Sequence, residues 1–314
     1  MKWGDMKIKE IIFNNNKTTL FEQIISFIKK DLYENKNENK FLNKIKFMKK
    51  YFFDKNNIKF VHISKTGGST IEEIGLKHGM KWGQFDNEYL NKDYIKLLNC
   101  SSWHTPIKYY RYNPYKDNIL FTVVRNPYDR VLSEFYCPYT GYFSRNNYNN
   151  DKSNETYEEW LITKKNHTIN DFNNWINKRL TEHNVSIFKK IKEILKHEHD
   201  TNQYDNNHTE ISDELQEYIE YLNKTYCLEL QVHFMPYYEY FTFNDEPIIS
   251  YVLRFENLVE TFNNLFENEM NINIHINKSH EKRFSISDLS EDNIILINKL
   301  YHKDFILFNY EKII

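Results

Sequence analysis

The stretch VHISKTGGST, residues 61–70, places a lysine, two adjacent glycines and two hydroxyl residues directly behind an apolar run. A strand that passes through a glycine turn into a helix directs free backbone N–H groups at one point, with the positive end of the helix dipole behind them. The chain has only 7 glycines among 314 residues, so the pair is informative. The stretch predicts an anion-binding loop made of Lys65, Thr66, Gly67, Gly68, Ser69 and Thr70.

The order of residues in this loop differs from that of an ordinary ATPase or GTPase. A Walker A loop has the form GxxxxGK followed by Ser or Thr. Here the lysine precedes the glycines, and no first glycine lies upstream. We therefore expect a phosphate loop of another kind, and the alternative is a plain tight turn with a surface lysine.

A second junction of strand and helix follows in the sequence NILFTVVRNPYDRVLSEF, residues 118–135. Arg125 stands at the end of the expected strand, Asn126 suits a helix N-cap, and Ser133 lies on the helix. In a parallel sheet both junctions open on the same edge. An arginine can bind a phosphate with two hydrogen bonds. The two junctions together predict a ligand that carries phosphates at two separate places.

The elements around these junctions indicate an α/β, P-loop-like, three-layer fold with a central, mainly parallel sheet flanked by helices. Strands are expected at 58–63, 118–124 and 248–254. Helices are expected from about 69, where Ser69 with Glu72 and Thr70 with Glu73 give capping-box patterns, and near both chain ends. We expect a helical N-terminal extension over 1–56, one domain over 57–314, and a mostly helical insert over 138–225.

Composition excludes several classes of protein. The formal net charge of −2 argues against a nucleic-acid-binding surface. No convincing metal cluster is present, and the three cysteines, Cys100, Cys137 and Cys227, follow no zinc spacing, although one disulfide is possible. No run of about 18 apolar residues predicts a transmembrane segment. We therefore expect a cytoplasmic protein, or a lumenal one of the secretory pathway if an anchor is missing from this chain.

The two motifs resemble the nucleotide-binding sequences of the sulfotransferase superfamily, in its carbohydrate (heparan-type) branch. The resemblance implies a donor, 3′-phosphoadenosine 5′-phosphosulfate (PAPS), with 3′-phosphoadenosine 5′-phosphate (PAP) as product. It places the 5′-phosphosulfate on the loop of residues 65–70 and the 3′-phosphate on Arg125 and Ser133. It extends to RFENLVETFNNLF (254–266) and to INKSHEKRF (276–284). The latter adds Ser279, Lys282 and Arg283 as expected donor contacts. Relatives carry a glutamine where this chain has Tyr237.

Sulfuryl transfer needs charge stabilisation and a base near the attacking hydroxyl. Lys65 is expected to neutralise charge on the leaving oxygen. Relatives often place their catalytic histidine between the two motifs, where His104 lies, and a structural histidine is the equal alternative. Of the other histidines, His62 is expected in the core, His78 on a helix surface, and His233 beside the adenine.

The predicted activity is PAPS-dependent transfer to a hydroxyl of a glycan. A protein tyrosine is the other acceptor considered. A kinase with a divergent phosphate loop and a non-catalytic glycan-binding protein are the alternatives outside the class. The acceptor, the hydroxyl that is attacked and the oligomeric state do not follow from the sequence.

Overall fold

The computed structural model describes residues 57–86, 101–110, 113–145, 148–149, 155–164, 166–201, 213–266, 270, 272 and 283–314. The predicted N-terminal extension, residues 1–56, lies outside this part of the chain. So do Cys100, Ser279 and Lys282. The free thiols of Cys137, which is buried, and Cys227, which is exposed, form no disulfide with each other.

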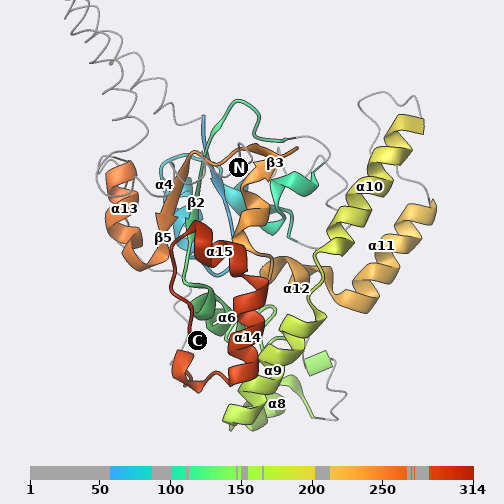
Figure 1. The fold of residues 1–314 in the computed structure, drawn as a ribbon, viewed down its shortest axis with the longest axis vertical. Coiled ribbons are helices and arrows are strands. Elements are labelled where there is room, and N and C mark those ends of the chain that lie inside the picture. The colour runs from blue at the N-terminus through green and yellow to red at the C-terminus, as the bar shows by residue number, and fades with distance from the viewer. Residues whose placement is uncertain are drawn as a thin grey trace, which may run out of the picture.

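A three-stranded parallel sheet of order β1-β2-β5 lies at the centre (Figure 1), as the sequence predicts. Its strands are β1 (Ile58–Val61), β2 (Ile119–Val124) and β5 (Tyr251–Arg254). Val61 pairs with Thr122, and Val124 pairs with Arg254. Because all three strands run the same way, the loops after β1 and β2 open at one edge.

Alternate residues of the strands pack into two different hydrophobic clusters, one on each face of the sheet. Phe60, Phe121 and Val123 belong to the cluster built with α4 (Gly68–Lys77) and α13 (Leu258–Leu265). Val61, Leu120 and Val124 belong to the cluster that includes Tyr109, Val232 and Tyr240. The sheet is therefore covered on both faces, which is the arrangement expected of a parallel sheet.

Helix α6 (Pro127–Phe135) follows β2 and begins as predicted. The side chain of Asn126 accepts a hydrogen bond from the Tyr128 N–H at 3.0 Å, and Pro127 occupies the first turn. One side of α6 packs against the insert and the C-terminal helices through Val131, Phe135 and their neighbours. Strand and cap together fix where Arg125 and Ser133 lie.

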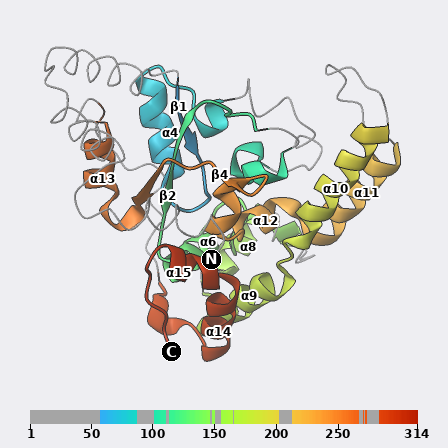
Figure 2. The ribbon, with the colours of Figure 1, turned by 45° about the horizontal axis from the view of Figure 1, so that its top comes forward.

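The described residues of the insert are mostly helical. The insert contains α8 (Tyr157–Lys164), α9 (Ile169–Glu182), α10 (Ser186–Thr201) and α11 (Asp213–Tyr226). Helices α10 and α11 lie side by side in Figures 1 and 2 and extend away from the sheet. The short helix α12 (Leu228–His233) and the small hairpin β3 (Thr242–Phe243) and β4 (Glu246–Pro247) lead back to β5.

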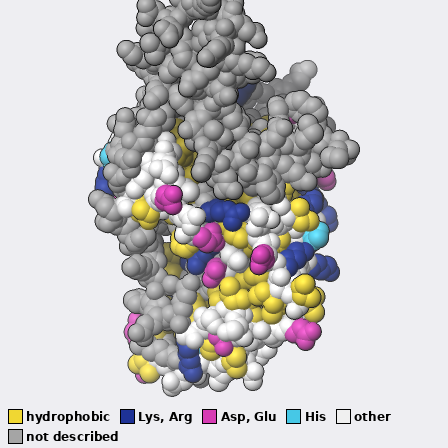
Figure 3. All heavy atoms as spheres, turned by 60° about the vertical axis from the view of Figure 1, so that its left-hand side comes forward, with side chains coloured by type: hydrophobic (Ala, Val, Ile, Leu, Met, Phe, Trp, Pro, Cys, Tyr) yellow, Lys and Arg dark blue, Asp and Glu magenta, His cyan; other side chains and the backbone are white. Residues whose placement is uncertain are grey.

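The C-terminal segment forms two helices, α14 (Glu291–Leu300) and α15 (His302–Leu307), where one was predicted. The break lies at Tyr301, whose side chain is fully buried and whose hydroxyl donates to the Phe234 carbonyl at 3.0 Å. On the face in Figure 3, acidic and basic side chains are interspersed with apolar ones over the described surface.

Candidate active site

The glycine loop leaves β1 in a left-handed conformation at two positions. Lys65 has φ 64° and Gly67 has φ 88°. The Thr66 hydroxyl donates to the Ile63 carbonyl at 2.7 Å and closes the turn. Gly67 is the N-cap of α4 and no side chain caps this helix, so the two predicted capping boxes are wrong. The free amides of the helix therefore remain open to an anion.

Arg125 lies beside this loop. Its Nη1 donates to the Lys65 carbonyl at 3.3 Å, and its guanidinium covers the Phe255 ring at 4.2 Å. Phe255 also lies against Gly67, where an added Cβ would meet its ring at 3.1 Å. The side chain is buried, and burial lowers the pKa of Arg125. Within the described residues neither Arg125 nor Lys65 forms an ion pair with an acid, so both charges are available to a ligand.

Two further residues are expected to contact the sulfuryl donor, and they lie on α6 and near its end. Ser133 faces inward on this helix and is buried. Arg283 is exposed, donates to the His167 carbonyl at 2.8 Å and lies over the Phe284 ring. The Phe284 N–H donates to the hydroxyl of Tyr136, which follows α6. Arg283 is thereby held near the end of the helix that carries Ser133.

Tyr237 supports the strand end of Arg125. Its hydroxyl donates to the Arg125 carbonyl at 2.9 Å and accepts from the Arg125 N–H at 3.2 Å. The Asp304 carboxylate accepts from the backbone N–H groups of Tyr237 at 2.7 Å and Tyr238 at 3.0 Å. Burial raises the pKa of Asp304 to about 7. Asp304 therefore holds Tyr237, and Tyr237 in turn holds the backbone of Arg125.

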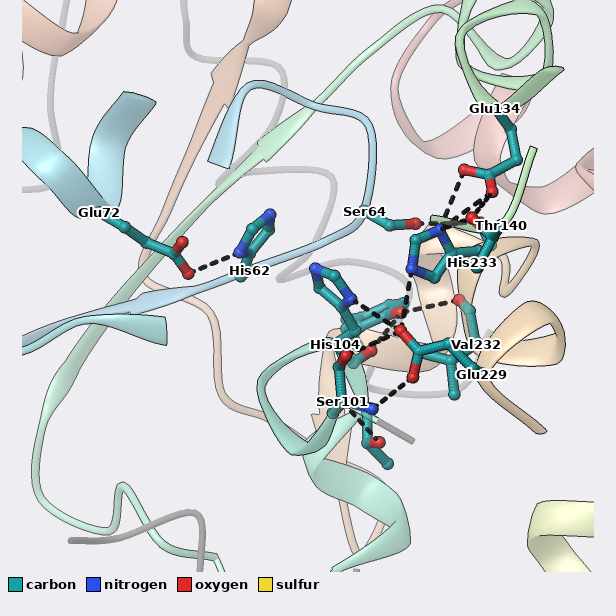
Figure 4. Close-up of polar contacts among 12 residues, drawn as sticks. His62, Ser64, Glu72, Ser101, His104, Glu134, Thr140, Glu229, Val232 and His233 are labelled. Carbon is teal, nitrogen blue, oxygen red and sulfur yellow. Dashed lines mark hydrogen bonds and ion pairs between the residues drawn. The ribbon is translucent and has the colours of Figure 1, made fainter. Parts of the chain in front are cut away.

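His104 ends the short 3₁₀ turn Ser102–His104 and lies between two other histidines (Figure 4). Its ring centroid is 4.5 Å from that of His62 and 4.9 Å from that of His233, edge to face in both cases. Its Nδ1 lies 3.7 Å from Oε1 of Glu229 and is buried without a hydrogen-bond partner among the described residues. The other predicted base candidate, His78, is exposed at the end of α4.

His104 forms a cluster with His233, Glu134 and Glu229, three residues that the sequence did not predict as a catalytic group. His233 receives contacts on both ring nitrogens, from Glu134 at 3.0 Å on Nδ1 and from Glu229 at 3.1 Å on Nε2. Thr140 donates to the Glu134 carboxylate, and the Ser101 hydroxyl donates to Glu229 at 2.8 Å. The only local signal is the spacing of Glu229 and His233, which are i and i+4 on α12.

The charges in this cluster differ from residue to residue. Burial, followed by the neighbouring His62, lowers the pKa of His104 to about 3. For His233 burial acts in the same direction, but the interactions with Glu134, Cys137 and Glu229 together outweigh it, and the pKa lies well above its ordinary value. Although burial raises the pKa of Glu134 and Glu229, their contacts with histidines lower both. His233 is thus a cation between two carboxylates, and His104 is a neutral imidazole.

His62 is buried, as the sequence predicts, and it also contacts a buried carboxylate. Its Nδ1 lies 2.6 Å from Oε1 of Glu72, one of the two glutamates that the sequence placed in capping boxes. Glu72 turns away from the helix start because it binds His62 and accepts from the Gln84 N–H at 3.0 Å.

Arg130 connects the glycine loop to the histidine cluster. Its buried guanidinium donates from Nε to the Ser64 carbonyl at 3.1 Å and from Nη2 to the His233 carbonyl at 2.9 Å. It also donates from Nη1 to the Met235 carbonyl at 2.7 Å. The Ser64 hydroxyl itself donates to the His233 carbonyl at 3.0 Å. The segment before the loop and α12 are therefore held together by the side chains of Arg130 and Ser64.

The ligand atoms of His104, Glu229 and His233 lie within 4.8 Å of one another, a spacing that a metal ion can bridge. The ion pairs of Glu229 with the two histidines account for the same spacing without a metal ion. Glu134, Cys137 and His233 form a second such group, again around the paired His233.

Residues 49–311 match the sulfotransferase family, and the chain belongs to that family. It is a sulfotransferase, an enzyme that moves a sulfuryl group from a sulfonate donor to a hydroxyl-bearing acceptor. No curated protein and no solved structure gives a significant match. Among the helices of the described residues, none has the length and apolar character needed to cross a bilayer.

Proposed function

We propose that the enzyme transfers the sulfuryl group of PAPS to a hydroxyl of a glycan by in-line displacement. The observation that carries the proposal is the 3.3 Å contact between the Arg125 guanidinium and the Lys65 carbonyl. It brings a buried arginine and the open amides of α4 to one edge of the sheet. Two anion sites side by side suit a nucleotide with phosphates at its 3′ and 5′ positions.

In this proposal the loop of residues 65–70 binds the 5′-phosphosulfate, and Arg125 and Ser133 bind the 3′-phosphate. Ser279, Lys282 and Arg283 contribute from the C-terminal side. As the bond from sulfur to the PAP oxygen breaks, negative charge grows on that oxygen. The ammonium of Lys65 neutralises it. A new bond from sulfur to the acceptor oxygen forms on the opposite side.

His104 is the proposed base. The proton of the attacking hydroxyl passes to Nε2 of His104, since Nδ1 points toward Glu229 (Figure 4). A neutral imidazole is the form that accepts a proton, and burial keeps His104 neutral. The imidazolium that forms is stabilised by the Glu229 carboxylate at 3.7 Å. The sulfuryl group thus moves from PAPS to the acceptor oxygen, and the hydroxyl proton moves to His104.

We propose that residues 57–314 form the transferase domain and that the insert, residues 138–225, supplies acceptor-binding surface. Thr140 at the start of the insert touches Glu134, and Glu229 follows its end directly. The insert therefore leaves and re-enters the fold at the histidine cluster. Our proposed acceptor is a carbohydrate, and a protein tyrosine remains the alternative acceptor for a screen to separate.

PAP binding in the presence of EDTA tests the donor. Thermal unfolding is measured with PAP, and with ATP and Mg²⁺ in parallel. At about 100 times its dissociation constant PAP should stabilise the protein by roughly 2.7 kcal/mol. Stabilisation by ATP with Mg²⁺ and not by PAP would overturn the donor assignment. Labelled PAPS with a panel of glycans and tyrosine peptides then identifies the acceptor.

A further inference from the structure

Cys137 lies just after the end of α6, and its buried thiol is close to a buried histidine and a buried carboxylate. The Cys137 Sγ, a carboxylate oxygen of Glu134 and a ring nitrogen of His233 all lie within 4.8 Å of one another. Within this group, Nδ1 of His233 lies 3.0 Å from Oε2 of Glu134. Thiolate, imidazole and carboxylate are the side-chain ligands of zinc. Cysteine spacing alone does not predict such a group, because His233 comes from a distant helix.

Two helices hold these three residues in place. Glu134 lies in the last turn of α6, and its carbonyl accepts from the Cys137 N–H at 2.9 Å, which fixes the two residues relative to each other. His233 is the last residue of α12, and its carbonyl accepts from Nη2 of the buried Arg130 at 2.9 Å. Because Arg130 belongs to α6, the two helix ends are joined beside the group. A metal site supported by helices is placed more precisely than one on loops.

The outer contacts of the group are those that zinc ligands usually make. Nε2 of His233 lies 3.1 Å from Oε1 of Glu229, and the Thr140 hydroxyl donates to the Glu134 carboxylate (Figure 4). A zinc-binding imidazole typically donates its other ring N–H to a carboxylate, and a ligating carboxylate is itself hydrogen-bonded. The other group of three, which includes the proposed base, has no thiol and is less buried. The group with Cys137 is therefore the better fit to zinc.

We propose that Glu134, Cys137 and His233 bind a zinc ion through one carboxylate oxygen, Sγ and Nδ1, with a water molecule as the fourth ligand. The ion takes the place of the Nδ1 proton and of the thiol proton, and both protons leave to solvent. The thiolate and the carboxylate offset its two charges, so the buried group stays neutral. The ion ties the end of α6 to α12. Neither Lys65 nor Arg125 contributes a ligand, so the inference does not depend on the PAPS donor.

Titration with Co²⁺ of the full chain, first freed of metal with a chelator, tests the site, because a bond between thiolate and cobalt produces an intense near-ultraviolet band. We expect one equivalent of Co²⁺ to give this band and Zn²⁺ to abolish it by displacement. Cys137→Ser should remove the band. The matched controls are Cys227→Ser, at an exposed thiol, and Cys100→Ser, at the third cysteine of the chain, and both should keep it.

A thiolate band that persists in Cys137→Ser, or that disappears in either control, would overturn the inference. So would a wild-type protein that takes up neither ion. If Cys137→Ser does not fold, X-ray absorption of the wild-type protein loaded with zinc decides instead. It should show one sulfur at about 2.3 Å and nitrogen or oxygen ligands at about 2.0–2.2 Å. Spectra without a sulfur ligand, or with more than one, would refute the site.

Discussion

Nδ1 of His104 lies 3.7 Å from Oε1 of Glu229, which is close enough for a strong electrostatic interaction and too far for a hydrogen bond. The buried imidazole is therefore oriented by a carboxylate that is itself committed to His233. This relationship determines how His104 should respond to substitution and to pH.

His104→Asn should lower turnover by about 10² to 10⁴, the usual contribution of a general base. PAP affinity should stay nearly unchanged, because His104 faces the acceptor. Lys65→Ala, by contrast, should lower both turnover and PAP affinity. The measurements are transfer from labelled PAPS and calorimetry with PAP. Near-normal turnover of His104→Asn would show that His104 is structural.

The pH profile should lack the limb that an ordinary histidine base produces near pH 6.5. Burial lowers the pKa of His104 to about 3, so the base is already neutral throughout the neutral range. The value of kcat/KM for the donor, which reports groups of the free enzyme, should not rise through a His104 titration between about pH 5.5 and 8. A rise there that disappears in His104→Asn would contradict the expectation.

Arg125→Ala should weaken PAP far more than adenosine 5′-phosphosulfate, which lacks the 3′-phosphate. Loss of a charge-assisted hydrogen bond to phosphate costs about 1.5–3 kcal/mol, or roughly 10- to 100-fold in affinity. Calorimetry with both ligands checks this. Equal losses would show that Arg125 does not bind the 3′-phosphate.

Asp304 should make the protein less stable as pH rises. Its folded pKa of about 7 lies above the ordinary value of 3.8. The folded state therefore binds more protons between these values, and the contribution present at low pH is lost as pH rises through 7. The lowered pKa of His104 makes the protein more stable as pH rises. The test therefore compares the stability of wild type with that of Asp304→Asn, in which the effect of His104 cancels. Denaturant unfolding of wild type and Asp304→Asn should show that wild type loses its advantage with rising pH. A constant difference would refute this.

Gly68→Ala should disturb His62 rather than the loop backbone. The new Cβ would lie 2.1 Å from Nε2 of His62 and would force the ring away from Glu72. We expect a loss of stability of about 1–3 kcal/mol, typical of overpacking, measured by denaturant unfolding. Gly79→Ala is a poor control because of its φ of 78°, so Ser69→Ala on the same turn serves instead. Equal stability of Gly68→Ala and wild type would contradict the packing.

The strand, turn and helix of each of the two motifs were predictable because their information is local. The glycine loop, the Asn126 cap and the strand end at Arg125 each depend on residues within one short motif. Because the strands are parallel, both motifs lie at the same edge of the sheet. For the same reason the start of α6 agreed with the prediction.

The cluster of His104, His233, Glu134 and Glu229 was not predictable, because its contacts join distant parts of the chain. His233 and Glu134 are 99 positions apart, and their pairing depends on how α12 packs against α6. The capping boxes failed for a similar reason: Glu72 binds His62, which the strand places beside it. The C-terminal helix is divided at Tyr301, whose hydroxyl donates to the distant Phe234 carbonyl, a contact that periodicity alone does not reveal.

The side chain of Arg130, which holds both Ser64 and the carbonyl of His233, has a thermodynamic consequence. A sulfuryl donor such as PAPS that orders the loop on binding also changes the free energy of the segment that carries His233. The affinity of each substrate then depends on whether the other is bound. Because such coupling is reciprocal, donor and acceptor should change each other's dissociation constants by one and the same factor, whichever of them is added first.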